Sequence, residues 1–344
     1  MRTTLAIVLL AGACSWDSNL DGARFACPDG TCPSGQTCIE GRCQPIPGDA
    51  GPPPPWWDEP FATRRRLRIH NLSDRTAEAG LPVMFTAEFA ELDIPGVDEM
   101  AVAYHDGVDW ERLPTYWVYQ ERFSDVFWFR LPADIAPFGV DDGVWLHTVY
   151  PGAPPDPMDG ITVWEQHDYF DGLDATWETS GDVTVADDSV HIGPGGQLRG
   201  LRTWPADHAV DVAIFAPAWG ATMSIGFQRS EDFADDAPLA RWAYHDPGFV
   251  PEVEVGAEEP WAGEAVIVAD ERVELGVDRL ADRVLFWLRE VVVTEHELDA
   301  PYDEPMQIRL DNTSDVTFSL AQLRVRRTMA PLPSVTLGEP EPRP

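Results

Sequence analysis

From Trp56 onward the chain consists of short runs rich in β-branched and aromatic residues, each bounded by Gly, Pro, Asp or Asn. The first of these runs cover residues 66–70, 83–89, 100–104, 116–119, 126–130 and 144–150. Short strands at this spacing are typical of an antiparallel sandwich or barrel. We therefore expect an all-β fold for most of the chain.

Similar runs continue in the second half of the sequence, at 210–216, 223–228, 265–269, 284–293, 320–327 and 333–339. With 344 residues, 44% of them apolar, and 14 tryptophans, the chain can build substantial cores. Once a leader and a tail are set aside, this length favours about two β domains.

The first residues form an export signal. A short apolar run follows Arg2 and ends in Ala11, Gly12 and Ala13, directly before Cys14. The run has about half of the roughly 20 residues needed to cross a bilayer, so we interpret residues 1–13 as a cleaved signal peptide. This ending resembles the lipobox of bacterial lipoproteins, which implies that Cys14 becomes the lipid-carrying first residue. The alternative is an ordinary signal peptide with an incidental cysteine.

The lipoprotein resemblance implies that the chain reaches its membrane partner through an N-terminal lipid anchor, because two or more acyl chains make anchoring stable. Ser15 stands where an aspartate favours inner-membrane retention in such lipoproteins, so the resemblance implies the outer membrane or cell surface. Residues 14–26 then serve as a tether. No second apolar stretch of the sequence is long enough to span a membrane.

The remaining cysteines are Cys27, Cys32, Cys38 and Cys43, spaced C-x4-C-x5-C-x4-C with turn residues between them. Residues 27–45 are too few to bury a core, so we expect two disulfides of open connectivity. The segment resembles the short EGF-like modules of bacterial surface proteins. A zinc site is the alternative, but an oxidising compartment and the absence of CxxC spacing favour disulfides.

Residues 46–55 form a Pro-rich linker, for which we expect an extended polyproline II conformation. Four ordered segments follow: WWDEPFATRRRLRIHN, AVAYHDGVDWERLPTYWVYQ, VFWFRLP and LHTVYPGAPP. Together they resemble the DUF2341 family, an all-β domain of exported bacterial proteins. The resemblance brings no catalytic residues with it, and it places a first β domain at 56–155.

The segment VWEQHDYFDGLDATWETSGDVTVADDSVHI, at 163–192, resembles the start of the concanavalin A-like jelly roll that often follows DUF2341. This implies a lectin-like or glucanase-like (LamG-like) sandwich over 160–338. After it, residues 339–344 are predicted to be a disordered tail. The expected fold class is thus all-β, a small disulfide-rich module followed by two β-sandwich domains.

The charge of the chain excludes several partners. It has no lysine, and its 24 arginines face 59 Asp plus Glu, for a net charge of -35. A surface of this sign repels phosphate backbones and anionic lipid headgroups, so we expect no nucleic-acid binding and no electrostatic docking to membranes.

Glycoside hydrolysis needs paired carboxylates at one site. The nearest arrangement is Glu252 and Glu254, which alternation along a strand could place on one face. The third carboxylate, Glu258, is out of register with them, and Gly256 interrupts the strand. We therefore expect no catalytic residues, with glycoside hydrolase activity kept as an alternative.

Two weaker patterns concern ligands. Acidic turns in the second domain suggest calcium as a cofactor, with Asp232, Asp235 and Asp236 as candidate ligands, because calcium takes six to eight oxygens. Nearby aromatic residues could stack on a sugar ring, and the candidates are Trp242, Tyr244 and Trp261. The competing interpretations are solvated acidic loops and core aromatic residues.

From these observations we expect a non-enzymatic lipoprotein of the cell envelope, whose β domains bind a polysaccharide or an envelope protein. The first alternative is a structural or adhesion protein that contacts other proteins, and the second is a glycoside hydrolase-like enzyme.

Overall fold

The computed structural model describes residues 36–39, 42–45, 53–87, 92, 99–118, 125–149, 160–215, 222–229, 239–245, 248–254, 260–267, 272–288 and 291–344. Two compact units divide the chain, Met1–Pro53 and Pro54–Pro344. In the first unit, β1 (Gln36–Ile39) and β2 (Arg42–Pro45) form an antiparallel hairpin whose register sets Cys38 opposite Cys43. The predicted tether residue Cys14, together with Cys27 and Cys32, lies outside the described residues.

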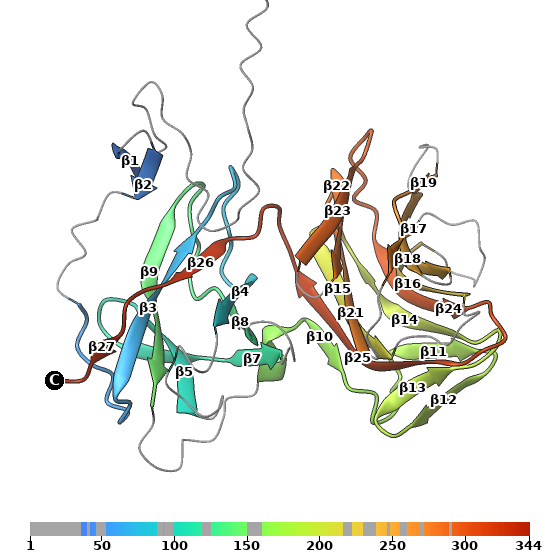
Figure 1. The fold of residues 1–344 in the computed structure, drawn as a ribbon, viewed down its shortest axis with the longest axis horizontal. Coiled ribbons are helices and arrows are strands. Elements are labelled where there is room, and N and C mark those ends of the chain that lie inside the picture. The colour runs from blue at the N-terminus through green and yellow to red at the C-terminus, as the bar shows by residue number, and fades with distance from the viewer. Residues whose placement is uncertain are drawn as a thin grey trace, which may run out of the picture. The chain divides into compact units, whose positions relative to one another are not determined.

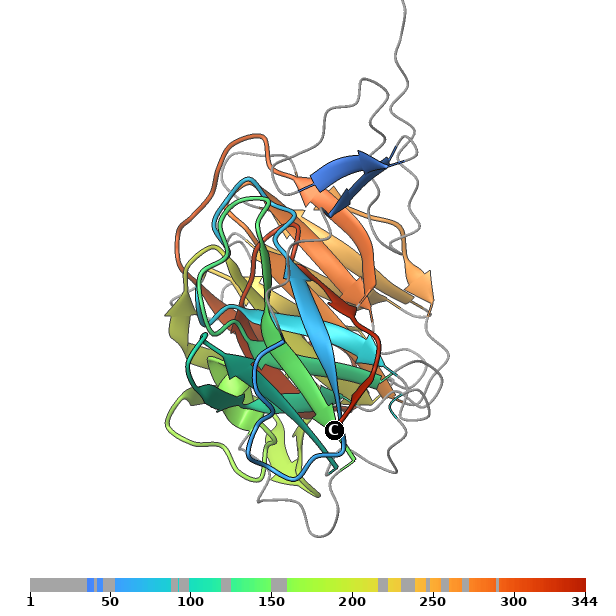
Figure 2. The same cartoon turned by 90° about the vertical axis from the view of Figure 1, so that its left-hand side faces the viewer.

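The second unit contains two antiparallel sandwiches (Figure 1). In the first sandwich the larger sheet, here the β3 sheet, runs in the order β26-β3-β9-β5-β6, with β27 also paired to β3. Strands β3 and β9 lie side by side in its centre (Figure 2). The strands of this sheet are β3 (Thr63–His70), β5 (Met100–His105), β6 (Trp110–Leu113), β9 (Val140–Thr148), β26 (Ser334–Leu337) and β27 (Glu341–Pro342).

The smaller sheet of this sandwich, here the β8 sheet, has the order β4-β8-β7. Its strands are β4 (Pro82–Ala87), β7 (Thr115–Val118) and β8 (Asp125–Arg130). Alternate residues of the two sheets, such as Leu67, Val83, Phe127 and Val144, meet in one apolar core.

The second sandwich follows a short 3-10 helix, η2 (Gly160–Val163). Its first layer, here the β25 sheet, has the order β12-β13-β25-β15-β21-β22-β23, with β10 also paired to β25. The strands are β10 (Gln166–Asp168), β12 (Val183–Ala186), β13 (Ser189–Ile192), β15 (His208–Phe215), β21 (Arg272–Arg279), β22 (Arg283–Leu288), β23 (Val291–Glu297) and β25 (Phe318–Arg327).

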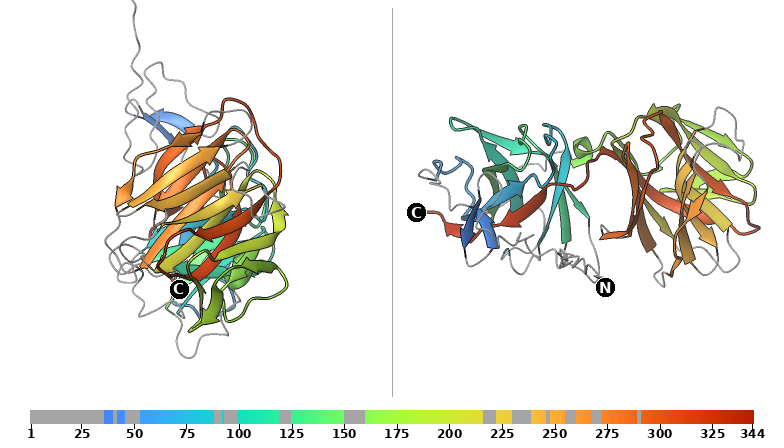
Figure 3. Two further views of the ribbon diagram at one scale, coloured as in Figure 1. Left: turned by 90° about the vertical axis from the view of Figure 1, so that its right-hand side faces the viewer. Right: turned by 90° about the horizontal axis from the view of Figure 1, so that it is seen from above.

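The opposite layer, here the β16 sheet, has the order β11-β14-β24-β16-β17-β18-β19, with β20 paired to β18 (Figure 3). Its strands are β11 (Trp177–Ser180), β14 (Gln197–Trp204), β16 (Thr222–Gln228), β17 (Leu239–His245), β18 (Gly248–Glu254), β19 (Trp261–Ala262), β20 (Val266–Ile267) and β24 (Met306–Asn312). The core between the layers includes Val212, Ile225, Phe286 and Leu323.

The chain returns from the second sandwich to the first. After β25 it forms β26 and β27, and both pair with β3. The structure differs from the prediction that residues 339–344 form a disordered tail. Glu341 pairs with Arg64 at 3.0 Å, and the Arg343 amide donates to the Ala62 carbonyl. The second sandwich is thus inserted between β9 and β26 of the first, which no composition argument reveals.

The all-β prediction is confirmed for the described residues of the second unit, and most predicted runs overlap a strand. The run 284–293, predicted as one strand, contains parts of two, because β22 and β23 pair as a hairpin. The described residues hold no helix that is long and apolar enough to cross a membrane.

Candidate functional site

A polar row crosses the outer face of the β16 sheet. Alternation along each strand points one set of side chains into the core and the other set away from it. The register then aligns the outward residues side by side across successive strands: Glu178 (β11), Arg199 (β14), Arg309 (β24), Gly226 (β16), Arg241 (β17) and Glu252 (β18). Five inter-strand spacings make this row about 24 Å long.

The charges of the row are paired within the sheet. Arg241 Nε donates to Glu252 Oε2 at 2.9 Å, Arg309 Nε donates to an oxygen of Asp311 at 2.8 Å, and Arg199 pairs with Glu178. Planar guanidinium and carboxylate groups in a fixed array offer directed donors and acceptors.

Exposure varies along the row. In the middle, the side chains of Arg309 and Asp311 are only 2% and 8% exposed, although they point away from the core. Towards one end, Arg241 and Glu252 are 27% and 24% exposed, and Glu178 at the other end is more exposed still. A ligand can therefore reach the ends of the row directly.

Gly226 is the centre of the row, and it is needed there. A Cβ atom at this position would lie 2.3 Å from the Ala240 carbonyl oxygen and 2.5 Å from Arg241 Cα. Only glycine tolerates such a close approach of two strands. Gly226 lies between Arg309 and Arg241 in the register, so no side chain projects from the sheet at this position of the row.

The structure places the predicted aromatic residues mainly in the core. Trp242 and Tyr244 point inward from β17, and Trp242 Nε1 donates to the Gly276 carbonyl at 2.9 Å. Trp261 is half-buried at the edge of the sheet and stacks on His296, with ring centroids 4.6 Å apart. A sugar would reach Trp242 or Tyr244 only if the two layers parted.

Glu252 and Glu254 do lie on one face of β18, since Val253 between them belongs to the core. Residues two apart on a strand are separated by about 6.6 to 6.8 Å. Inverting glycosidases hold their two carboxyl groups about 6.5 to 9.5 Å apart. The position of the pair thus fits the general requirement, but an oxygen of Glu252 is already taken by Arg241.

The calcium candidates Asp232, Asp235 and Asp236 lie outside the described residues. Within the part of the chain that is described, no group of three or more His, Cys, Asp and Glu side chains is placed to hold a metal ion. Calcium stays a prediction.

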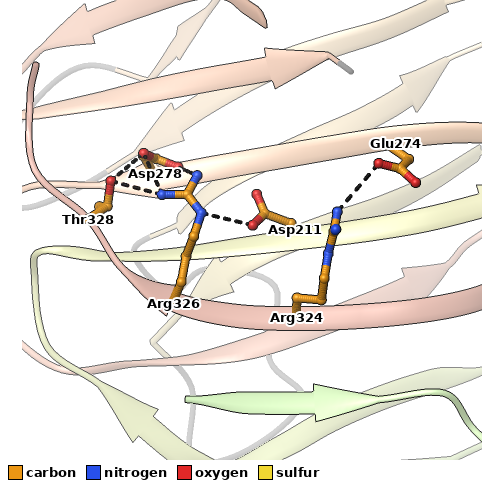
Figure 4. Close-up of polar contacts among 6 residues, drawn as sticks. All are labelled: Asp211, Glu274, Asp278, Arg324, Arg326 and Thr328. Carbon is orange, nitrogen blue, oxygen red and sulfur yellow. Dashed lines mark hydrogen bonds and ion pairs between the residues drawn. The ribbon is translucent and has the colours of Figure 1, made fainter. Parts of the chain in front are cut away.

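A second polar cluster, on the outer face of the β25 sheet, was not anticipated from the sequence (Figure 4). The guanidinium of Arg326 lies between two carboxylates, donating to Asp211 at 3.0 Å and to Asp278 at 2.9 Å. Thr328 donates its hydroxyl proton to Asp278, and neighbouring Arg324 pairs with Glu274 at 3.4 Å. Side chains of Arg326 and Asp278 are each 1% exposed.

Small residues make room for these arginines. The register sets Arg326, Ala209 and Asp278 in one line across β25, β15 and β21, so Arg326 spans the strand that carries Ala209. In the next line Gly276 lies beside Asp211, and a Cβ atom there would come within 2.6 Å of the Asp211 carboxylate.

In this cluster the carboxyl groups of Asp211 and Asp278 share the single guanidinium of Arg326, so one positive charge faces two acidic groups. Burial disfavours the charged form of Asp278 and the nearby Asp211 adds to the effect, so its pKa rises to about 6 even though Arg326 and Thr328 oppose the shift.

The cluster is covered by residues of the first sandwich and by Trp164, which directly follows η2. Arg326 lies over the Trp128 ring at 4.9 Å, and Arg324 lies over Trp164 at 5.0 Å. Arg130 in β8 donates to the carbonyls of Val163 and Trp164. This face of the β25 sheet is therefore an internal interface. The alternation of Gln322, Arg324 and Arg326 in the sequence marks an outward face but cannot tell whether solvent or protein covers it.

No model of a known protein family matches the chain, and no curated protein matches it. Among solved structures, an endo-β-1,3-glucanase from Pyrococcus furiosus matches with a TM-score of 0.42 and 11% identity, over 48% of this chain and 94% of that one. An immunostimulatory antigen and pseudo β-1,3-glucanase of Mycobacterium tuberculosis matches with a TM-score of 0.39 and 12% identity, over 48% and 99%. For the Bacillus licheniformis β-glucanase the values are 0.37, 10%, 47% and 97%.

Each of these three matches covers about half of this chain. The resemblances to bacterial lipoproteins, EGF-like modules and DUF2341 stay predictions.

Proposed function

We propose that this chain is a non-enzymatic, lipid-anchored protein of the cell envelope that binds a glycan on the outer face of the β16 sheet. The observation that carries the proposal is the transverse row from Glu178 to Glu252, whose charged groups are aligned by strand register. A row about 24 Å long fits an extended chain of several sugar units better than a small metabolite.

The chemistry of the row also supports a binding role. Sugar hydroxyls both donate and accept hydrogen bonds, and the guanidinium and carboxylate groups along the row supply both kinds of partner. Because each cation is matched by a carboxylate within the sheet, a neutral ligand is favoured over a strongly charged one. Export through residues 1–13 and acylation at Cys14 would present the face outside the cytoplasm.

Hydrolysis is the second candidate, and one observation favours it: Glu252 and Glu254 share a face of β18. The two candidates separate in a single assay, because only hydrolysis releases new reducing ends. Release abolished by Glu252→Gln or Glu254→Gln would establish the enzyme and reject the non-enzymatic proposal.

The test is a binding screen of the purified chain against soluble glucans, xylans, mannans and chitin oligosaccharides, with calcium and again with chelator, scored for retention and for reducing sugar. We expect retention without release, weakened at least several-fold by Arg241→Ala. The matched control is Arg283→Ala, an arginine of similar exposure in the β25 sheet, which should bind like wild type. Equal retention of both variants, or no retention on any glycan, would reject the proposed site.

A further inference from the structure

The outer face of the β3 sheet in the first sandwich carries an aromatic cluster around one histidine. His147 in β9 is surrounded by rings whose centroids lie 5.1 to 6.3 Å from its own. The surrounding rings are Trp56, Trp57, Phe61 and Trp110. Trp57 and Trp110 are half-buried and lie nearly parallel, with 6.5 Å between their centroids and 28° between their planes.

The cluster is fixed in place by polar contacts. Arg64 lies over Trp56 at 4.6 Å and over Trp145 at 4.4 Å, donates to the Pro54 carbonyl, and pairs with Glu341. The Trp110 indole N–H donates to the Pro55 carbonyl at 3.0 Å. These contacts hold Trp56, Trp110 and the backbone at Pro54 and Pro55 against the sheet, and none of these contacts is made by the Trp57 ring.

His147 is the feature that the fold leaves unexplained. Its side chain is 0% exposed, and in the described part of the chain neither ring nitrogen has a hydrogen-bond partner. Desolvation by burial, with smaller contributions from Arg64 and Arg343, lowers its pKa to about 3, so the imidazole is neutral near pH 7. Buried polar atoms without partners are rare in native proteins, and each calls for an explanation.

The surroundings restrict what kind of ligand could satisfy this group. A neutral imidazole offers one donor and one acceptor, which matches a hydroxyl group. The positive charges of Arg64 and Arg343 disfavour a metal ion, and the guanidinium of Arg64 already contacts Glu341, Pro54 and Pro55, which disfavours an anion. Half-buried indole rings suit the apolar face of a ring-shaped ligand.

We propose that this cluster is a second glycan-binding site, in which Trp57 and Trp110 stack on a neutral sugar and His147 hydrogen-bonds one of its hydroxyls. The site goes beyond the proposed function, because it lies on the other sandwich and uses aromatic stacking rather than an ionic row. His147 has no exposed surface, so the Trp57 ring turns aside when the sugar enters. Binding then changes tryptophan fluorescence.

The experiment is a calorimetric and fluorescence titration of the purified chain with laminarihexaose, cellohexaose, mannohexaose and chitohexaose. The variants are Trp110→Ala and His147→Phe, the second of which keeps a ring of similar size. Arg241→Ala in the β16 sheet is the control. We expect both first-sandwich variants to lose roughly tenfold or more in affinity at one site, with a fluorescence change in wild type, and Arg241→Ala to leave that site intact.

The outcomes separate the two proposals. Loss of all binding in Arg241→Ala with wild-type binding in Trp110→Ala and His147→Phe would overturn this inference and leave the proposed function standing. Loss in the first-sandwich variants alone would support this inference and overturn the row on the β16 sheet as the glycan site. If no hexasaccharide binds, this inference is rejected. Equal urea midpoints of wild type and His147→Phe exclude unfolding as the cause of a lost signal.

Discussion

Replacing Arg326 by methionine tests the buried cluster of the β25 sheet. The substitution removes the guanidinium but keeps an unbranched apolar stem that still packs on Trp128. It leaves the carboxylates of Asp211 and Asp278, which are 6% and 1% exposed, without the cation they share. Breaking a buried ion pair from one side costs about 3 to 5 kcal/mol. We expect a loss of that size in the free energy of unfolding at pH 8.

A matched control lies at the next position. Arg327→Met removes an arginine whose pair with Glu78 is largely in solvent, with side chains 35% and 62% exposed. Such pairs contribute about 0 to 1 kcal/mol. Urea unfolding followed by tryptophan fluorescence and far-UV circular dichroism compares the two variants. A loss below about 1 kcal/mol for Arg326→Met, equal to that of Arg327→Met, would refute the reasoning.

The same cluster predicts a pH dependence of definite sign. The folded-state pKa of Asp278 is about 6, above its ordinary value of 3.8, so folding favours the protonated acid. Its contribution to stability is fully present below about pH 4 and is lost as the pH rises through 6. At about 1.36 kcal/mol per pKa unit the loss is about 3 kcal/mol. We expect the stability of wild type relative to Asp278→Asn to fall by that amount between pH 4 and pH 7. A rise instead would mean that Arg326 outweighs burial.

Three further substitutions test other parts of the fold by urea unfolding. Gly226→Ala places a Cβ atom 2.3 Å from the Ala240 carbonyl oxygen and should cost about 1 to 3 kcal/mol, whereas Gly172→Ala, with open space around it, should stay within about 0.5 kcal/mol; equal effects would contradict the close approach. Asn312→Ala removes two hydrogen bonds of 2.7 Å that the side-chain amide donates to the Ile192 and Val316 carbonyls, and it should cost about 1 to 3 kcal/mol. A neutral result would show that these carbonyls find other partners. Because the pKa of His147 is depressed to about 3, its contribution to stability is lost as the pH falls below about 6.5. The free energy of unfolding of His147→Phe should therefore rise relative to that of wild type by about 1.4 kcal/mol per pH unit between pH 6 and pH 4. A constant difference would mean that the imidazole is not buried as described.

Many of the strands could be predicted from the sequence, because apolar and polar residues alternate with a period of two along them. In β15, Val210, Val212 and Ile214 alternate with Ala209 and Asp211, and this pattern alone predicts a strand with one apolar face. The pairing of β26 and β27 with β3 could not be predicted, since it joins residues about 270 positions apart through an edge whose partners are set by tertiary contacts. The run 333–339, which contains β26, was predicted as a strand without its partner, whereas the Pro- and Glu-rich residues 339–344, which contain β27, were predicted to be disordered.

The candidate sites were harder to predict than the strands. Alternation says that Trp242 and Tyr244 share a face of β17, but not which face is the core. The same ambiguity hid the covered outer face of the β25 sheet, where Arg324 and Arg326 are buried beneath Trp164 and Trp128. The charge of a side chain indicates that it needs a partner, and only the fold decides whether that partner is water or protein.

The packing of the two sandwiches narrows where a ligand can bind. Each sandwich has two outer faces. The outer face of the β25 sheet contacts that of the β8 sheet, where Arg326 meets Trp128 and Gln322 bonds to Tyr116. The faces that remain are those of the β16 sheet, with its ionic row, and the β3 sheet, with the rings around His147. Both proposed sites therefore occupy the faces that the internal interface leaves free.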